Sequence, residues 1–443
     1  MISLALCVGI FFGAVLAANR SLGTGLGFVF AIGYAYGITR ANIQQPLAHL
    51  LFDVAVLGLY ASQLWRAVPR DERPVQQGIR SWVVLLCAWP VVLFCLSPQR
   101  DPLVELVGLR SNIFLLPFVL LGARLSDDDM ERLATTIAVL NLGAAGLAGA
   151  QYVYGIEPFY PYTEVTELIY RSNDLLERTA YRLPSSFPNA HVFGGTMAMS
   201  IPWLVGALMR RRTERWKTLL HMAALAASLL SIFAAGARTP IVALGLMAVA
   251  ITISSQFRGR MLTRWAVVAG LVLYVVAGDP RLQRFVTLTD TALLQERITN
   301  SVNEDFFDLV GESPLGNGLA GGGTSIPYFL QERQQNQMTL ENEYARIVLE
   351  LGVPGLVMWV GFIAWVATRS AGDRDSTWFL GQRVAWVGAL GYFVVALTGI
   401  GLLTAVPQSS VMLMNLGWAI AAGARGRQRA MRLRLAPRVR RVA

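Results

Sequence analysis

Long runs of apolar residues alternate with short polar segments along the chain, and this pattern predicts a bundle of membrane-spanning helices. Most runs hold about 17–25 residues, which is enough for a helix to cross roughly 30 Å of hydrocarbon. We therefore expect an all-α polytopic membrane protein with twelve to fourteen transmembrane helices. The thirteen candidate spans are 3–18, 22–38, 47–65, 81–97, 111–125, 133–153, 192–209, 218–236, 241–255, 266–278, 344–368, 383–406 and 410–424.

Two long polar segments interrupt the apolar pattern. They divide the chain into N-terminal helices (1–153), a loop (154–190), central helices (191–278), a large loop (279–343), C-terminal helices (344–424) and a basic tail (425–443). The large loop carries ten acidic residues against four arginines. Within it, "NEDFFDLV" predicts a short amphipathic helix and "SPLGNGLAGGG" predicts a glycine-rich turn. Loops of this length are commonly functional, so we expect a folded lid over one membrane face.

Composition and charge support this picture and set the orientation. Hydrophobic residues make up 54% of the chain and charged residues 15%, whereas about a quarter of the residues in a soluble protein are charged. The net charge of +10 comes from short loops and from a tail with eight arginines and no acid. The positive-inside rule places these segments and the C-terminus in the cytoplasm, and both long loops outside. Because the basic residues are scattered over short loops, the charge does not indicate nucleic-acid binding.

Isolated arginines on the outer side are candidates for ligand binding. In "AAGARTPIVALG", Arg238 lies between two apolar spans, where an arginine is costly and is normally retained for a partner or an anion. We expect Thr239 and Pro240 to form a tight turn there; the alternative is that Arg238 only extends to the interface. We expect Arg297 on the first polar helix of the large loop, where its local sequence favours pairing with Glu296 or Glu304 over a ligand. Asn317, in "PLGNG", lies where backbone N–H groups could hold phosphate.

The stretch "TLENEYARIVLELG" places polar residues at the start of an apolar span. We expect this helix to begin near Thr339, with Glu341 in its first turn. Glu341 could complement the helix dipole or, where its surroundings tune it, accept a proton from a hydroxyl. Asn342 and Tyr344 would lie at the same rim. The later residues Glu343, Arg346 and Glu350 have the spacing of ordinary intrahelical ion pairs.

A third group of candidates lies at other outer ends of spans. In "YRLPSSFPNAHVFGGTMA", Arg182 and His191 precede a span with small residues that allow close helix packing. His191 alone is more typical of a hydrogen-bonded interface residue than of a ligand. Arg110 lies on the same side. The other two histidines fall within spans, and the three cysteines are also in apolar runs, so the sequence indicates neither a metal site, nor another cofactor, nor a disulfide framework.

In this order, the motifs resemble the O-antigen polymerase and ligase superfamily of bacterial membrane glycosyltransferases. The resemblance covers roughly residues 109–361 and runs through "GLRSNIFLLPFVLLG", "SSFPNAHVFGGTMA", "AAGARTPIVAL", "ERITNSVNEDFFDLVGESPLGNGLAGG" and "ENEYARIVLELGVPGL". It implies about a dozen helices with a large extracytoplasmic loop that covers the active site. It also implies location in the inner membrane with the site facing the periplasm.

The resemblance implies that undecaprenyl-diphosphate-linked glycans are donor and acceptor, that transfer is metal-independent and inverting, and that chain-length regulators or export proteins are further partners. It implies catalytic roles for Arg238, Arg297 and Glu341. Substrate-binding roles follow for Arg110, Arg182, His191, Asn317, Asn342 and Tyr344. Family ligases resemble each other in having His where this chain has Glu341, which favours a polymerase of O-antigen, capsule or exopolysaccharide. A ligase acting on lipid A core, or a flippase for the same lipid-linked sugars, stays an alternative.

Overall fold

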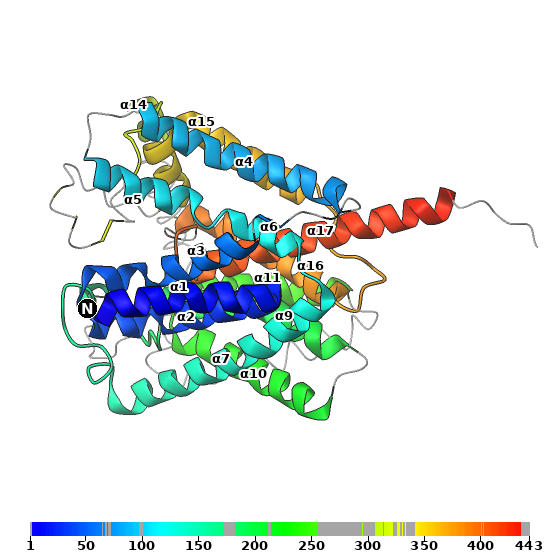
Figure 1. Ribbon diagram of the computed structural model, residues 1–443, viewed down its shortest axis with the longest axis horizontal. Coiled ribbons are helices and arrows are strands. Elements are labelled where there is room, and N and C mark those ends of the chain that lie inside the picture. Colours follow the sequence, from blue (N-terminus) through cyan, green and yellow to red (C-terminus); the bar gives the residue numbers. More distant parts are fainter. Residues whose placement is uncertain are drawn as a thin grey trace, which may run out of the picture.

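The computed structural model describes most of the chain, and every regular element in that part is helical (Figure 1). The described residues are 2–63, 65, 66, 69, 72–96, 101–171, 182–210, 214–254, 295, 306–312, 314–321, 326, 327, 330, 333, 342–399, 401 and 403–435. Eight helical segments among them have the length and hydropathy needed to cross a membrane. The prediction of an all-helical, polytopic membrane protein is therefore confirmed in its coarse form.

The eight segments are α1 (Ile2–Arg20), α2 (Leu22–Asn42), α4 (Arg73–Leu96), α5 with α6 (Pro102–Ile113 and Pro117–Ala123), α7 (Asp127–Tyr154), α9 (Ala190–Met209), α10 (Arg215–Ala234) and α15 (Glu343–Ala367). The other helical elements are η1 (Pro46–Leu50), α3 (Leu51–Gln63), α8 (Glu167–Arg171), α11 (Arg238–Ser254), α14 (Phe306–Glu312), α16 (Phe379–Val395), η5 (Ala396–Thr398) and α17 (Gln408–Leu435).

Twelve of the thirteen predicted spans fall on described helices, while 266–278 lies outside the described residues. The prediction of twelve to fourteen spans therefore stays a prediction. The predicted span 111–125 is wrong in extent, because the helical segment begins at Pro102, where Asp101 caps α5, and breaks at 114–116 before α6. The predicted span 383–406 is also displaced, since α16 begins at Phe379 and ends at Val395. Helix α17 continues through Leu435, so the first part of the predicted tail is helical.

The long helices run side by side and connect two opposite faces of the bundle (Figure 1). We call one end the long-loop face, because it carries the described parts of 155–189 and 306–333. It lies at the left of Figure 1. We call the other end the basic face, because it carries Arg66, Arg210, Arg215 and the arginines of the α17 extension, at the right of Figure 1. The candidate residues of the outer side that the structure describes belong to the long-loop face.

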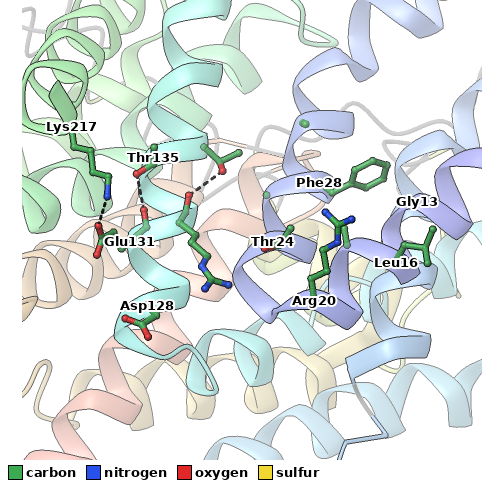
Figure 2. A pocket seen from close by; sticks show the side chains of 14 residues that line it. Gly13, Leu16, Arg20, Thr24, Phe28, Asp128, Glu131, Thr135 and Lys217 are labelled. Atoms are coloured by element: carbon green, nitrogen blue, oxygen red, sulfur yellow. Dashed lines mark hydrogen bonds and ion pairs between the residues drawn. The ribbon is translucent and has the colours of Figure 1, made fainter. Parts of the chain in front are cut away.

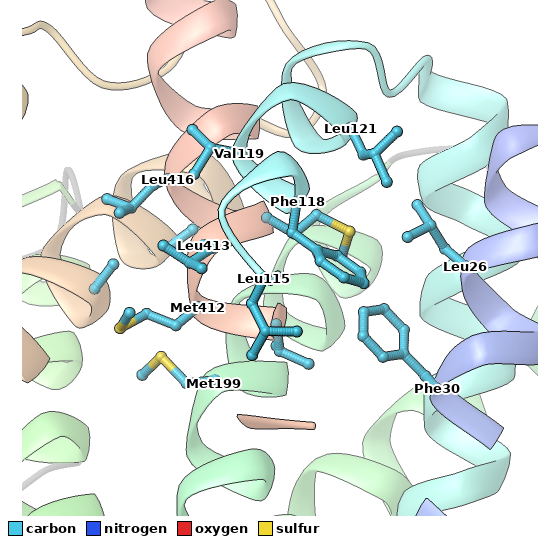
Figure 3. Close-up of a cluster of buried hydrophobic side chains, with 14 of the residues drawn as sticks. Leu26, Phe30, Leu115, Phe118, Val119, Leu121, Met199, Met412, Leu413 and Leu416 are labelled. Carbon is cyan, nitrogen blue, oxygen red and sulfur yellow. The ribbon is translucent and has the colours of Figure 1, made fainter. Parts of the chain in front are cut away.

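Close backbone approach holds the centre of the bundle together. A Cβ on Gly122 of α6 would lie 2.1 Å from Met414 O, and a Cβ on Gly417 of α17 would lie 1.8 Å from Val119 O. Only glycine permits this crossing, and small residues serve the same purpose in membrane helices generally. Around the crossing, side chains of α2, α6, α9 and α17 interlock, including Phe30 (Figure 3).

A buried hydrogen-bond network joins four helices in the same bundle. Asn141 of α7 accepts from Tyr34 Oη over 2.6 Å and donates to Ser200 Oγ and Ser228 Oγ, each over 2.8 Å. All four side chains are buried. The hydrogen bonds among them therefore satisfy polar groups that would find no partner in lipid. The network fixes α2, α9 and α10 against α7 and so positions the helix ends at the long-loop face.

Candidate functional site

Helix α15 is broken at Gly352, whose φ of 68° and ψ of −175° lie outside the helical region. The break separates the Val353 N–H from Leu349 O, its expected partner four residues earlier. Both groups bond instead to the turn at 314–321. Val353 N–H donates to Pro314 O over 2.9 Å, and Asn317 N–H donates to Leu349 O over 2.6 Å. The glycine-rich turn is therefore docked on the break, as backbone groups at membrane depth require.

The docked turn explains why glycine occupies the break. A Cβ on Gly352 would lie 2.5 Å from the carbonyl carbon of Leu315. A third backbone group freed by the break, Leu351 O, accepts the indole N–H of Trp89 from α4 over 2.8 Å. Helix α14 packs beside this region, with Phe306 and Val310 against α15. The predicted short helix is thus confirmed over Phe306–Glu312 and the predicted turn over 314–321, and both lie against α15.

The first half of α15 holds a buried ionic cluster, which we call the α15 triad: Glu343, Arg346 and Glu350. Arg346 bonds to Glu343 Oε1 through Nε (3.0 Å) and Nη2 (2.8 Å), and to Glu350 Oε2 through Nη1 (2.6 Å). Asn112 of α5 donates to Glu350 Oε2 over 2.8 Å, and Gly401 N–H donates to Glu343 Oε2 over 2.6 Å. The predicted intrahelical pairs are confirmed, and the triad also joins α15 to two other segments.

The α15 triad carries one more carboxylate than guanidinium. All three side chains are at most 1% exposed, and within the described residues Glu350 Oε1 has no hydrogen-bond partner. With both carboxyl groups ionised the formal charge is −1. A buried uncompensated charge is costly, so the triad depends on Arg346 for its stability. Its buried position gives it a structural role, as the sequence indicates.

A second polar cluster lies where α2, η1, α3 and α5 meet at the long-loop face. Arg110 makes a two-pronged ion pair with Asp53, through Nε to Oδ2 and Nη2 to Oδ1, each over 2.6 Å. The Tyr36 hydroxyl donates to His49 O over 3.0 Å, and Arg40 lies over the Tyr36 ring at 5.5 Å. The side chain of Arg110 is 34% exposed, so this paired guanidinium still reaches the surface.

We call Arg40, His49, Asp53 and Arg110 the Asp53 cluster. Its two arginines set its electrostatics. Burial, together with the positive charges of Arg40 and Arg110, lowers the pKa of His49 from 6.5 to about 4. His49 is therefore neutral near pH 7. With Asp53 ionised, the cluster has a formal charge of +1 at the membrane surface. That balance suits an anion better than a cation.

Arg182 and His191 come together ahead of α9. Arg182 Nη1 lies 2.6 Å from His191 Nε2; since arginine can only donate, the imidazole accepts and is neutral, with its proton on Nδ1. Asn189 caps α9 by accepting from the Val192 N–H over 2.9 Å. The preceding loop is tied to α7 by Gln151, whose amide exchanges two hydrogen bonds with the Ser185 backbone.

Arg238 is the first residue of α11 and follows α10 after a short turn. The turn is made by residues 235–237, with Gly236 at φ 61°, so the expectation that Thr239 and Pro240 form it is wrong. Both residues instead lie in the first turn of α11. Pro240 packs against α9, since a Cβ on Gly194 would lie 3.2 Å from its Cγ. Arg238 therefore begins a helix that lies directly against the start of α9.

Two of the three residues predicted to be catalytic, Glu341 and Arg297, lie outside the described residues. Helix α15 begins at Glu343 rather than near Thr339. The expected helix start is therefore wrong by about one turn, because Asn342 has an extended backbone and caps the helix.

The remaining predicted residues have identifiable internal bonds. Asn342 is buried and accepts from the N–H groups of Tyr344 (2.8 Å) and Ala345 (3.4 Å). The Tyr344 hydroxyl donates to Phe393 O over 2.7 Å, which ties α15 to α16. Asn317 has an exposed side chain and uses its N–H to dock on α15. Asn342 and Tyr344 therefore help to build the start of α15.

Sequence reasoning missed Arg40, His49, Asp53 and Asn112. One signal was present for Asp53, because a carboxylate in the first turn of an apolar helix normally requires a basic partner. Its partner is 57 residues away, and Asn112 lies 238 residues from Glu350. No local pattern relates positions that far apart, so the pairing follows from packing alone.

The long-loop face thus carries several arginines at fixed positions, three on different helices and Arg182 in the loop before α9. Arg40, Arg110, Arg182 and Arg238 are all partly exposed. Guanidinium groups bind phosphate and carboxylate in a two-pronged manner and keep their charge at any physiological pH. The arrangement is suited to holding a polyanionic group at the membrane surface.

Comparison with known proteins adds no further assignment. No protein-family model matches the chain, and no curated protein matches it significantly.

Proposed function

We propose that this chain is a membrane glycosyltransferase that polymerises lipid-diphosphate-linked oligosaccharide repeat units at the long-loop face. The observation that carries the proposal is the set of arginines on that face, Arg40, Arg110, Arg182 and Arg238, each positioned by a different helix or loop. Under this proposal the lipid diphosphate binds at the end of the bundle where these side chains lie. The resemblance of the sequence motifs to O-antigen polymerases and ligases supports the same substrate class.

The reaction is a single displacement at the anomeric carbon of the donor sugar. The bond from this carbon to the diphosphate oxygen breaks, and a bond to the acceptor hydroxyl oxygen forms on the opposite side, which inverts the configuration. The hydroxyl proton passes to a base, and the lipid diphosphate leaves with its additional negative charge. Stabilising that charge lowers the barrier, and arginine does so without a change of protonation.

In this mechanism Arg238 and Arg297 hold the departing diphosphate, and Glu341 receives or orients the hydroxyl proton. Arg182 and Arg110 contribute charge for the donor or acceptor lipid. His191 presents a neutral imidazole for sugar hydroxyls. Asn317, whose side chain is exposed, lies on the turn docked to α15 and contacts a sugar in this proposal.

The proposal is tested by polysaccharide output from cells that carry Arg238→Ala, Arg297→Ala or Glu341→Gln, with membrane levels checked by blotting. Arg215→Ala is the matched control for the two arginine variants. It also removes one positive charge, but from an exposed position on the basic face. We expect each of the three variants to lose long polymer, while single repeat units are still made and exported. The control should make polymer of normal length.

Other outcomes contradict the polymerase. Normal polymer that fails to reach lipid A core would identify a ligase. Repeat units retained on the cytoplasmic side would identify a flippase. Unchanged polymer in all three variants would remove the assigned catalytic roles.

A further inference from the structure

A groove opens on the basic face, at the opposite end of the bundle from the proposed catalytic site. It lies between the end of α1, the start of α2 and the start of α7, with Lys217 of α10 at one side (Figure 2). Its volume is about 1080 Å³. Pockets for small molecules usually hold about 300–1,000 Å³, so the groove has room for a larger ligand.

One wall of the groove is apolar. It is lined by Gly13, Leu16, Ala17, Phe28 and Ala31. The two α7 threonines of the lining, at 135 and 136, donate their hydroxyl groups to backbone carbonyls of their own helix. This wall is therefore matched to a hydrocarbon chain.

The groove is open to the hydrocarbon at its side. Leu16 is 66% exposed and lines the groove, and the neighbouring Phe12 on α1 is 59% exposed. In a helix of this hydropathy, such side chains face lipid. A ligand can thus enter laterally from the bilayer.

The mouth of the groove carries positive charge that is available to a ligand. Three basic and two acidic side chains line it, and one of the acids, Glu131, is already paired with Lys217 over 3.0 Å and with Arg210 over 2.7 Å. Arg20 and Arg132 are exposed and have no ion-pair partner in the part of the chain that the structure describes. In Figure 2 the Arg20 side chain extends along the groove beside Thr24 and Phe28.

We propose that this groove binds one anionic phospholipid of the bilayer. Its phosphate lies at Arg20 and Arg132, where guanidinium groups hold it, and an acyl chain lies along the wall that contains Phe28 and Ala31. The site is separate from the long-loop face and does not depend on the function proposed for that face.

The test is native mass spectrometry of the full-length protein, delipidated in detergent and titrated with dioleoyl phosphatidylglycerol. Phosphatidylcholine with the same acyl chains is the comparison lipid. We expect one phosphatidylglycerol adduct that binds about tenfold more tightly than phosphatidylcholine. Both lipids carry a phosphate, but the choline cation leaves phosphatidylcholine without net charge and is repelled by the two arginines. The double variant R20A/R132A should lose this preference. Ala31→Phe, which keeps the arginines and fills the apolar wall, should lower binding of the adduct.

The matched control is R215A/R432A, which removes two exposed arginines of the basic face that do not line the groove. It should keep the preferred adduct. Equal phosphatidylglycerol binding by the wild type, R20A/R132A and Ala31→Phe would overturn the proposal. So would equal binding of the two lipids by the wild type.

Discussion

At the scale of single residues, the α15 triad shows why an intrahelical ion pair can matter more here than on a soluble helix. An exposed pair contributes about 0.3–0.5 kcal/mol, but these side chains are at most 1% exposed. Removing one member of a buried pair leaves an uncompensated charge, which costs far more than the pair itself contributes. Removing Arg346 and neutralising Glu350 should therefore have very different effects on stability.

We predict that Arg346→Met destabilises the protein by about 3–5 kcal/mol, because it leaves two buried carboxylates together. Glu350→Gln should change stability by less than about 1 kcal/mol, since it removes the excess charge and keeps an acceptor for Arg346 and Asn112. Thermal-shift measurements of both variants in detergent compare their stabilities. A larger loss for Glu350→Gln than for Arg346→Met would contradict this account of the triad.

A pH dependence follows from His49. Folding lowers its pKa from 6.5 to about 4, so the folded protein disfavours the protonated form. The stability that His49 contributes is present above pH 6.5 and is lost as the pH falls toward about 4. We expect the unfolding midpoint of the wild type to fall across this window more steeply than that of His49→Gln, which does not titrate. Parallel curves for the two proteins would show that His49 is not the group responsible.

At the scale of single elements, the break in α15 decides how the large loop attaches to the membrane helices. We predict that Gly352→Ala destabilises the protein by about 2–3 kcal/mol or more. Its φ of 68° suits glycine, and the new Cβ would meet the Leu315 backbone at 2.5 Å. Gly146→Ala on α7 is the matched control, because a Cβ there has open space. The control should raise the free energy of unfolding by about 0.5–1 kcal/mol, and thermal shift measures both variants. Equal shifts would show that the turn is not docked on the break.

The same elements show how far the sequence could lead. Periodicity and hydropathy predict where most helices lie, because each helix satisfies its own backbone and needs no distant partner. The break in α15 was not predicted, although Gly352 and Pro354 close together were a signal. The turn that completes it comes from 314–321, and Asn112 and Gly401 reach the triad from other parts of the chain. These long-range pairings depend on packing, so residue spacing could not supply them.

At the scale of the whole molecule, charge and chemistry are separated between two faces. Arg40, Arg110, Arg182 and Arg238 lie on the long-loop face, whereas the groove and the extension of α17 lie on the basic face. A polymerase that uses exported lipid-linked sugars requires the long-loop face to lie outside the cytoplasm. The positive-inside rule requires the same orientation independently.

This orientation can be measured directly. We predict that a cysteine at position 162 is labelled by a membrane-impermeant maleimide in intact spheroplasts, whereas one at position 431 is labelled only after lysis. Tyr162 is 71% exposed in the loop after α7, and Met431 is 64% exposed on the α17 extension, so both positions are accessible to reagent. The background should lack Cys7, Cys87 and Cys95, of which only Cys95 is exposed. The reverse labelling would place the arginines of the long-loop face in the cytoplasm and would exclude a polymerase that acts on exported repeat units.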